Sequence, residues 1–270
     1  MIKVLMYHRI VEDEIVSRIS DLCLHKEDFR RHLKLLERFG FTPITLNDYS
    51  LSLGGELTLP KKPIILTFDD GYRDTYEIAF PLLQEFGMKA VIFVLGDRSI
   101  NINRWDAENG MPAATLMDAR QIVEMHSAGL EIGSHSMTHA RLTEIPQDRL
   151  WEEIQRSRMV LEILLNAPVQ SFSYPYGLVN DIVEQVVIDA GYSFGCGVYS
   201  GPPIFGARPY QIRRLEIGNS TGGVGFMTRI LTPYPHYAWC RWKAGSLVRT
   251  RFGRRGHTPA MEISNNQQPI

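Results

Sequence analysis

The stretch Pro63-Ile-Ile-Leu-Thr-Phe-Asp-Asp-Gly71 decides the fold class of this chain. A run that is apolar except for Thr67 stops at two adjacent carboxylates and a glycine. Such a run, without polar alternation, is typical of a strand covered on both faces, as in a parallel sheet. The residues that follow it predict an exposed turn at the carboxyl end of that strand.

Strands and helices alternate on both sides of this stretch. Strands are predicted over about 2–7, 41–46, 90–95, 130–134, 169–174, 192–198 and 211–217, and helices over about 27–39, 74–86, 118–128, 147–165 and 181–190. The pattern favours a single β/α domain, closed as a barrel or doubly wound as an open sheet. Both architectures place chemistry at the carboxyl ends of the strands.

Three smaller expectations follow from the same patterns. The helix over 147–165 is predicted to carry Glu152 and Glu153 on its polar face. The glycine-rich stretch 218–225 lacks the lysine of a phosphate-binding loop and predicts a flexible loop without a nucleotide. His25, His32 and His126 fall in or near predicted helices, and we expect them on the surface.

Composition narrows the class of protein. The 270 residues carry a formal net charge of −1 and are 44% hydrophobic, as in ordinary globular proteins. No apolar stretch approaches the roughly 20 residues of a membrane-spanning helix, and the amino terminus predicts no signal peptide. Three scattered cysteines without a C-x-x-C pair favour a reducing compartment. We therefore expect a cytoplasmic protein.

The charge is unevenly distributed. Residues 217–261 contain no Asp or Glu but seven Lys and Arg residues. We expect a barrel domain over 1–240 and a basic, poorly ordered tail over 241–270. Such a tail can instead make weak contact with an anionic membrane surface, which would place the protein at the inner membrane face. Because no nucleic-acid motif accompanies the charge, no nucleic-acid partner is expected.

Unusual polar residues follow several of the predicted strands. They are His8, Asp69 with Asp70, His135, the turn 174–177, and Arg213 with Arg214. Such side chains are unfavourable at the end of a buried strand unless they are paired, hydrogen-bonded or coordinated. Their convergence on one rim predicts a functional site there.

Two of these clusters suggest a metal. Adjacent carboxylates at Asp69 and Asp70 repel each other unless a cation neutralises one of them, although a plain turn also uses these residue types. His135 and His139 are four residues apart, as in other histidine pairs that bind one ion, although surface histidines are common. Together with Asp70 they make a set that leaves coordination positions open, as catalytic sites do.

Three motifs carry a family resemblance. In chain order, Thr67-Phe-Asp-Asp-Gly71, His135-Ser-Met-Thr-His139 and Phe172-Ser-Tyr-Pro-Tyr-Gly177 resemble the motifs of the polysaccharide deacetylases, the NodB-homology or carbohydrate esterase family 4 proteins. The resemblance covers about residues 1–217. It implies a distorted (β/α) barrel, usually with seven strands, and metal-dependent hydrolysis of acetyl groups from an N-acetylated oligo- or polysaccharide.

The resemblance also implies roles for individual residues. Asp70, His135 and His139 would hold the metal, most often zinc, with cobalt, nickel or manganese as alternatives. Asp69 would be the general base. The backbone N–H of Tyr176 would donate to the oxyanion that forms on the substrate.

Two residues of the family pattern are missing from this sequence, and other residues would have to take their roles. The third motif lacks the arginine that pairs with the catalytic aspartate, and Arg213 or Arg214 could replace it; we place Arg213 in the catalytic set. The fifth motif, Leu-x-His, has no histidine in the matching stretch 211–217.

An early histidine offers the missing acid. Met6-Tyr-His-Arg-Ile10 resembles the amino-terminal Tyr-His motif of the poly-N-acetylglucosamine deacetylase-like branch, which implies that His8 protonates the departing amine. His236 is the reserve candidate, and Trp105 is the predicted wall of the substrate site.

The sequence leaves alternatives to an active deacetylase. The departures from the third and fifth motifs are also compatible with a degenerate family member that binds glycan without turnover. Related barrels host a cyclic-amide amidohydrolase chemistry, which would need a small closed pocket.

Overall fold

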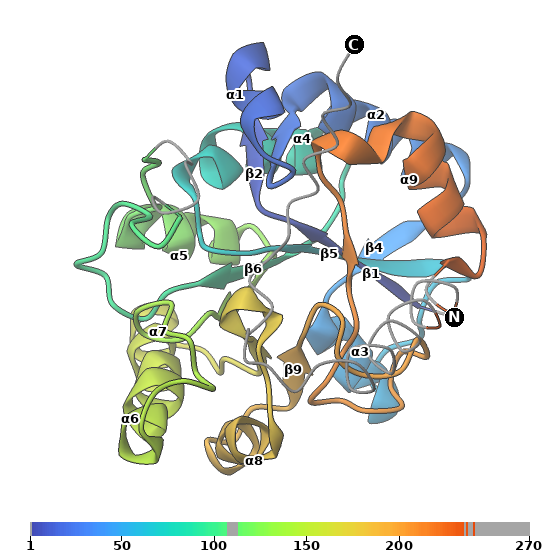
Figure 1. The fold of residues 1–270 in the computed structure, drawn as a ribbon. Helices are drawn as coiled ribbons and strands as arrows, with labels where there is room; N and C mark the ends of the chain where they lie inside the picture. Colours follow the sequence, from blue (N-terminus) through green and yellow to red (C-terminus); the bar gives the residue numbers. More distant parts are fainter. Residues whose placement is uncertain (1, 107–112, 235, 237–239, 241–270) are drawn as a thin grey trace, which may run out of the picture.

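Seven parallel strands form the curled sheet at the centre of the molecule (Figure 1). The computed structural model describes residues 2–106, 113–234, 236 and 240. In spatial order the strands are β10 (Leu215–Glu216), β1 (Lys3–Tyr7), β5 (Pro63–Phe68), β6 (Val91–Val94), β7 (Glu131–Ser134), β8 (Ser171–Ser173) and β9 (Phe194–Cys196). A further strand, β4 (Thr42–Ile44), pairs in parallel with the first half of β5.

An irregular segment bridges the two ends of this sheet. Gly195 in β9 donates its N–H to the Pro209 carbonyl at 2.8 Å and accepts from the Ile212 N–H at 2.8 Å. The segment 209–214 then leads directly into β10. The sheet is therefore an irregular half-barrel, which confirms the expected distorted barrel of seven strands.

Helices cover the outside of the sheet (Figure 1). The main ones are α2 (Lys26–Arg38), α4 (Phe80–Glu85), α5 (Ala119–Ser127), α6 (Gln147–Trp151), α7 (Ser157–Leu165), α8 (Asp181–Asp189) and α9 (Gly222–Leu231). Smaller elements are α1 (Glu14–Ile19), α3 (Leu46–Leu53), the 3-10 turns η4 (Pro175–Gly177) and η5 (Asn219–Thr221), and a two-stranded sheet of β2 (Arg9–Val11) and β3 (Cys23–His25).

The central strands are buried on both faces, as the apolar runs predict. In β5, Ile64 and Leu66 join the core cluster shared with the helices, whereas Ile65 joins a second cluster with Val4 and Phe93 from the neighbouring strands. Successive side chains of a strand point to opposite faces, so each face contributes to a separate apolar layer. This explains why β5 shows no polar alternation.

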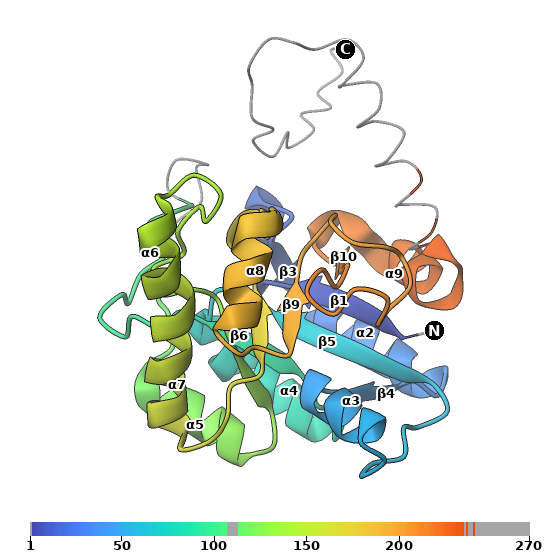
Figure 2. The ribbon, with the colours of Figure 1, turned by 90° about the horizontal axis from the view of Figure 1, so that it is seen from below.

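Two predicted helices contain π segments. The predicted helix over 74–86 is a π turn, η1 (Thr75–Ala79), followed by α4. The predicted helix over 147–165 is α6, then the π turn η3 (Glu152–Arg156), then α7, and these form one rod (Figure 2). Across η3 the buried residues Leu150, Glu153, Ser157 and Leu161 still recur at intervals of three or four, as on one face of a helix.

Two local expectations are wrong. The stretch 218–225, predicted as a flexible loop, forms η5 and the start of α9, because Phe226 and Ile230 of α9 are buried against the body of the protein. His32 is 2% exposed rather than on the surface, and its ring stacks on Phe226 at a centroid distance of 3.9 Å.

The other general expectations concern thiols, membranes and the tail. All three cysteines are free, with Cys23 and Cys196 buried and Cys240 exposed. Among the described residues, no helix combines the length and the apolar character that crossing a membrane requires. The predicted basic tail, 241–270, lies outside the described residues.

Candidate metal centre

The carboxyl ends of neighbouring parallel strands assemble the site. Asp69 and Asp70 follow β5, His135 follows β7, and Ser173 ends β8. In the sheet Phe68 lies beside Tyr7 and Ser134 beside Phe172, so the residues that follow these strands lie on one rim. This is the rim that the sequence predicts.

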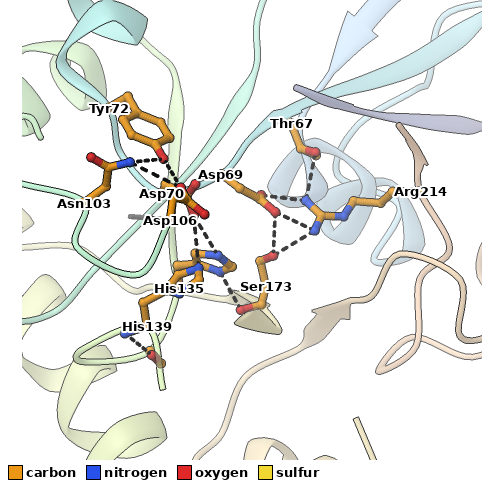
Figure 3. Close-up of polar contacts among 11 residues, drawn as sticks. Thr67, Asp69, Asp70, Tyr72, Asn103, Asp106, His135, His139, Ser173 and Arg214 are labelled. Atoms are coloured by element: carbon orange, nitrogen blue, oxygen red, sulfur yellow. Dashed lines mark hydrogen bonds and ion pairs between the residues drawn. The ribbon is translucent and has the colours of Figure 1, made fainter. Parts of the chain in front are cut away.

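Asp70, His135 and His139 meet as the expected metal-binding set. Asp70 Oδ1 lies 3.2 Å from His135 Nε2 and 3.3 Å from His139 Nε2 (Figure 3). One ligand atom from each of the three residues lies within 4.8 Å of the other two, and all three residues are buried. The two imidazoles thus point their Nε2 atoms at the same carboxylate oxygen.

The chemistry of the donors fits a divalent metal. His135 Nδ1 lies 2.8 Å from the Ser173 carbonyl oxygen, which can only accept, so Nδ1 carries a proton, and Nε2 is the nitrogen that would offer its lone pair when a metal binds. Burial alone would raise the pKa of Asp70, but hydrogen bonds to the two imidazoles hold it well below its usual range. Two imidazoles and one carboxylate form a donor set suited to zinc and other first-row divalent ions.

His139 is held by ring packing. Among the described residues its Nδ1 has no hydrogen-bond partner. Its ring stacks on Trp105 at a centroid distance of 4.4 Å and an interplanar angle of 16°, and it meets the Tyr176 ring edge-on at 4.6 Å. Trp105, predicted as a wall of the substrate site, therefore has one ring face against a candidate metal ligand.

Left-handed backbone conformations cluster in the site. Asp70, Ser136, His139 and Tyr176 have φ values of 72°, 63°, 64° and 59°. Among the described residues, Asn166 is the only other non-glycine residue with positive φ. Such conformations cost about 1–3 kcal/mol each and persist where the surroundings over-determine them, typically at functional sites.

Asp69 forms a bidentate ion pair with a buried arginine. Arg214 donates from Nη1 to Asp69 Oδ1 at 2.6 Å and from Nη2 to Oδ2 at 2.7 Å (Figure 3). Arg214 is 2% exposed and also donates to Thr67 Oγ1 and to Ser173 Oγ. Burial alone would raise the pKa of Asp69, but the charge and hydrogen bonds of Arg214, together with the charges of His135 and His8, lower it. Asp69 is therefore an ionised carboxylate, as a general base must be.

The placement of Arg213 corrects the predicted catalytic set. Arg213 donates to the carbonyl oxygens of Gly201 and Tyr199 instead of Asp69. Successive residues of an extended segment point to opposite sides, so only one of the two arginines can face the interior of the barrel. The structure gives this position to Arg214.

His8 lies close to the two aspartates. It follows β1 and is half-buried. Its charge, when it is protonated, contributes to lowering the pKa of both Asp69 and Asp70. His236 is not among the main groups that shift the pKa of either carboxylate.

Tyr176 sits at the turn after β8, in η4. Its left-handed conformation turns the backbone beside the metal ligands, and its ring contacts His139. The Arg141 guanidinium lies over the Tyr176 ring, 4.1 Å from its centroid, and this cation–π contact holds the turn from outside.

Sequence reasoning missed a buried network beside the centre. The Tyr72 hydroxyl donates to Asp106 Oδ2 at 2.7 Å, and the Asn103 amide donates to the Tyr72 oxygen at 3.0 Å (Figure 3). This network ties the loop that carries Trp105 to the turn that follows Asp70. The position of Tyr72 directly after the Asp-Asp-Gly turn was the available signal.

Comparison with known proteins identifies the family. The family model of the polysaccharide deacetylases matches residues 56–195, more than half of the chain. The chain belongs to this family, and its class of activity is the hydrolytic deacetylation of polysaccharide.

Individual relatives agree with this assignment. The chain is 28% identical over 223 residues to YxkH of Bacillus subtilis strain 168, which is named for the same family, covering 83% of this chain and 74% of that protein. It is 21% identical over 234 residues to a poly-beta-1,6-N-acetyl-D-glucosamine N-deacetylase of Staphylococcus aureus strain MRSA252, covering 80% and 78%. The solved structure of the deacetylase PplD of Streptococcus pyogenes shares the fold, with a TM-score of 0.72, 23% identity and coverage of 85% and 97%.

Proposed function

We propose that this chain is a zinc-dependent N-deacetylase that removes acetyl groups from N-acetylglucosamine units of a polysaccharide or its precursor. The proposal rests on one observation: the carboxylates of the adjacent residues Asp69 and Asp70 have different partners. Asp70 lies against His135 and His139, whereas the preceding residue, Asp69, forms an ion pair with Arg214. A metal ligand and an ionised base therefore share a single turn.

A divalent metal held by Asp70, His135 and His139 would lower the pKa of a bound water and polarise the acetamide carbonyl, and hydrolysis of an unreactive acetamide requires both effects. Asp69 accepts the proton of the attacking water, and Arg214 keeps that carboxylate ionised and oriented. His8 donates a proton to the departing amine. The backbone N–H of Tyr176 donates to the developing oxyanion.

The structure removes one reason to regard the chain as degenerate. The arginine that the third motif lacks is replaced by Arg214, which reaches Asp69 from the segment before β10. This supports turnover over glycan binding alone, because a glycan-binding site has no need of a buried, bidentately paired carboxylate beside a metal set.

The polymer is proposed from the relatives together with the site. The Staphylococcus aureus relative is named for poly-beta-1,6-N-acetyl-D-glucosamine. We therefore propose β-1,6-linked N-acetylglucosamine as the substrate class and zinc as the metal, because the donor set contains two imidazoles and one carboxylate.

The test is a panel of substrates and metals. Metal-stripped protein is supplied with zinc, cobalt, nickel or manganese and given β-1,6-linked or β-1,4-linked N-acetylglucosamine oligomers or a cyclic amide. We expect the fastest acetate release from the β-1,6-linked oligomers with zinc. Turnover of the cyclic amide alone would refute the deacetylase assignment, and faster turnover of the β-1,4-linked oligomers would refute the proposed linkage.

A further inference from the structure

We propose that Glu153 is a positioning residue of the metal centre: it holds the loop between His135 and His139 in the conformation that brings both imidazoles to Asp70. Glu153 lies outside the set of candidate ligands and comes from the next helical segment along the chain, in the π turn η3. The inference rests on the metal site of the proposed function and adds a residue that supports this site from behind.

Three hydrogen bonds from the loop end on this one residue. The Thr138 N–H donates to Glu153 Oε2 at 3.0 Å, and the Thr138 hydroxyl donates to Oε1 at 2.7 Å. The N–H of the preceding residue, Met137, donates to the Glu153 backbone carbonyl at 2.9 Å. Both residues in the middle of the loop are therefore fixed by the side chain and the backbone of Glu153.

The loop needs such support because its conformation is unfavourable. Ser136 and His139, which flank Met137 and Thr138, both have left-handed backbones, with φ values of 63° and 64°. A loop with two such residues relaxes unless its surroundings fix it. Relaxation would move His139 relative to His135, because the loop is the covalent connection between them. Holding Met137 and Thr138 therefore holds the distance between the two ligands.

The position of Glu153 in the helix explains how it reaches the loop. The sequence pattern predicts Glu153 on the polar face, but it is only 5% exposed. It lies three residues after the buried Leu150 and four before the buried Ser157, so it shares their inward face. Its neighbour Glu152 stays on the surface and pairs with Arg149. Ser157, at the start of α7, also donates from its hydroxyl to the Ser136 carbonyl, at 3.0 Å. The helix rod thus contacts the loop at both ends of the π turn, and π turns are frequent at functional sites.

A buried carboxylate is also an unfavourable way to fill space. Its desolvation is offset only by good hydrogen bonds, and an apolar side chain of similar volume would pack in its place without this penalty. At Glu153 both carboxylate oxygens are used, and both are used on Thr138. These contacts indicate that the role of Glu153 is to hold the loop.

The test compares three variants of the full chain by zinc affinity, measured in competition with a chelator, and by the visible absorption of the cobalt form. Glu153→Met keeps the length and removes both acceptors, so we expect zinc affinity to fall about 10- to 100-fold, the usual effect of losing a residue that orients metal ligands. Glu153→Gln can accept the Thr138 N–H bond and pair with the hydroxyl, so it should restore affinity and the cobalt spectrum. Glu152→Ala, the exposed neighbour, is the matched control and should bind like the wild type.

A second readout separates positioning from general stability. For each variant we measure the Tm with zinc and without metal. The difference between the two reports the affinity of the folded state for zinc, whatever the stability of the metal-free form. Glu153→Met should show a smaller rise than the wild type. Wild-type affinity and a full rise in Glu153→Met would overturn the proposal, and so would a Glu153→Gln variant as weak as Glu153→Met.

If Glu153→Met does not fold, the variant Thr138→Val tests the proposal instead. It keeps the backbone N–H and the shape of the side chain but removes the hydroxyl bond to Oε1. We expect a smaller loss of zinc affinity in the same direction, and unchanged affinity would overturn the proposal. These readouts do not use turnover, so a wild-type protein that released no acetate would refute the proposed function and leave this result standing.

Discussion

Arg214 and Asp69 form a buried, bidentate ion pair between two segments that lie far apart in the sequence, with Nη1–Oδ1 at 2.6 Å and Nη2–Oδ2 at 2.7 Å. The pair joins the turn after β5 to the segment before β10, across the irregular side of the half-barrel. Arg214 therefore both pairs with the base and ties the end of the barrel to the active site.

The first prediction concerns this pair. Lysine cannot reproduce the two-pronged contact of a guanidinium, so Arg214→Lys should misplace Asp69 and lower kcat by about 10- to 100-fold. Arg213→Lys is the matched control, because Arg213 contacts the Gly201 and Tyr199 carbonyls instead. Steady-state kinetics checks both. Equal losses in the two variants would contradict the assignment of the pairing role to Arg214.

The second prediction concerns the acid. His8→Gln should lower kcat by about 10²- to 10⁴-fold, the usual contribution of a general acid, with little change in zinc affinity. The loss should shrink on an acetyl ester, because an alkoxide can leave without prior protonation more readily than the nitrogen anion that an unprotonated amide would expel. His236→Gln should retain activity, because His236 is not among the main groups that shift the pKa of either site carboxylate. The reverse order of losses would make His236 the acid.

The third prediction separates two roles for Trp105. Its ring is stacked on His139, so Trp105→Leu should loosen this ligand and weaken zinc binding about tenfold or more. A tryptophan that served only as a wall for the sugar would instead raise KM and leave zinc affinity unchanged. Measuring zinc affinity and KM on the same preparation distinguishes the two roles.

The fourth prediction concerns the pH dependence of stability. Burial, and then the charges of Arg31 and Arg229, lower the pKa of His32 to about 3 from an ordinary value of 6.5. Between these values the unfolded chain binds a proton that the folded chain does not, so stability is lost as the pH falls below about 6.5. The slope due to His32 should approach about 1.4 kcal/mol per pH unit.

Urea unfolding of His32→Leu between pH 7 and pH 5 checks this slope. Leucine keeps an apolar contact for Phe226 of α9 and cannot bind a proton. The variant should therefore lose less stability than the wild type over this range. An unchanged slope would show that His32 does not take part in the acid sensitivity.

The sequence indicated the residues that meet at the candidate metal centre more readily than the residues that support them. Asp69, Asp70 and His135 follow apolar runs, and a polar residue at such a point marks the carboxyl end of a parallel strand. The base's partner could not be chosen, because whether Arg213 or Arg214 faces inward depends on an irregular segment whose register is set by its contacts with β9.

Two other features were hidden for physical reasons. Helix α9 begins with glycines of poor helical propensity and is stabilised by the burial of Phe226, which is a tertiary effect. Glu153 is a charged residue and is therefore predicted on the polar face, whereas its burial depends on its hydrogen bonds to Thr138, which is a tertiary effect. Local patterns reveal neither effect.

The central claim is metal-dependent deacetylation with Asp69 as the base, and acetate release from β-1,6-linked N-acetylglucosamine oligomers tests it most directly. Metal-stripped protein should be inactive, zinc should restore turnover, and Asp69→Asn should bind zinc but release acetate at least about 100-fold more slowly. Zinc-independent acetate release, or full activity in Asp69→Asn, would contradict the account.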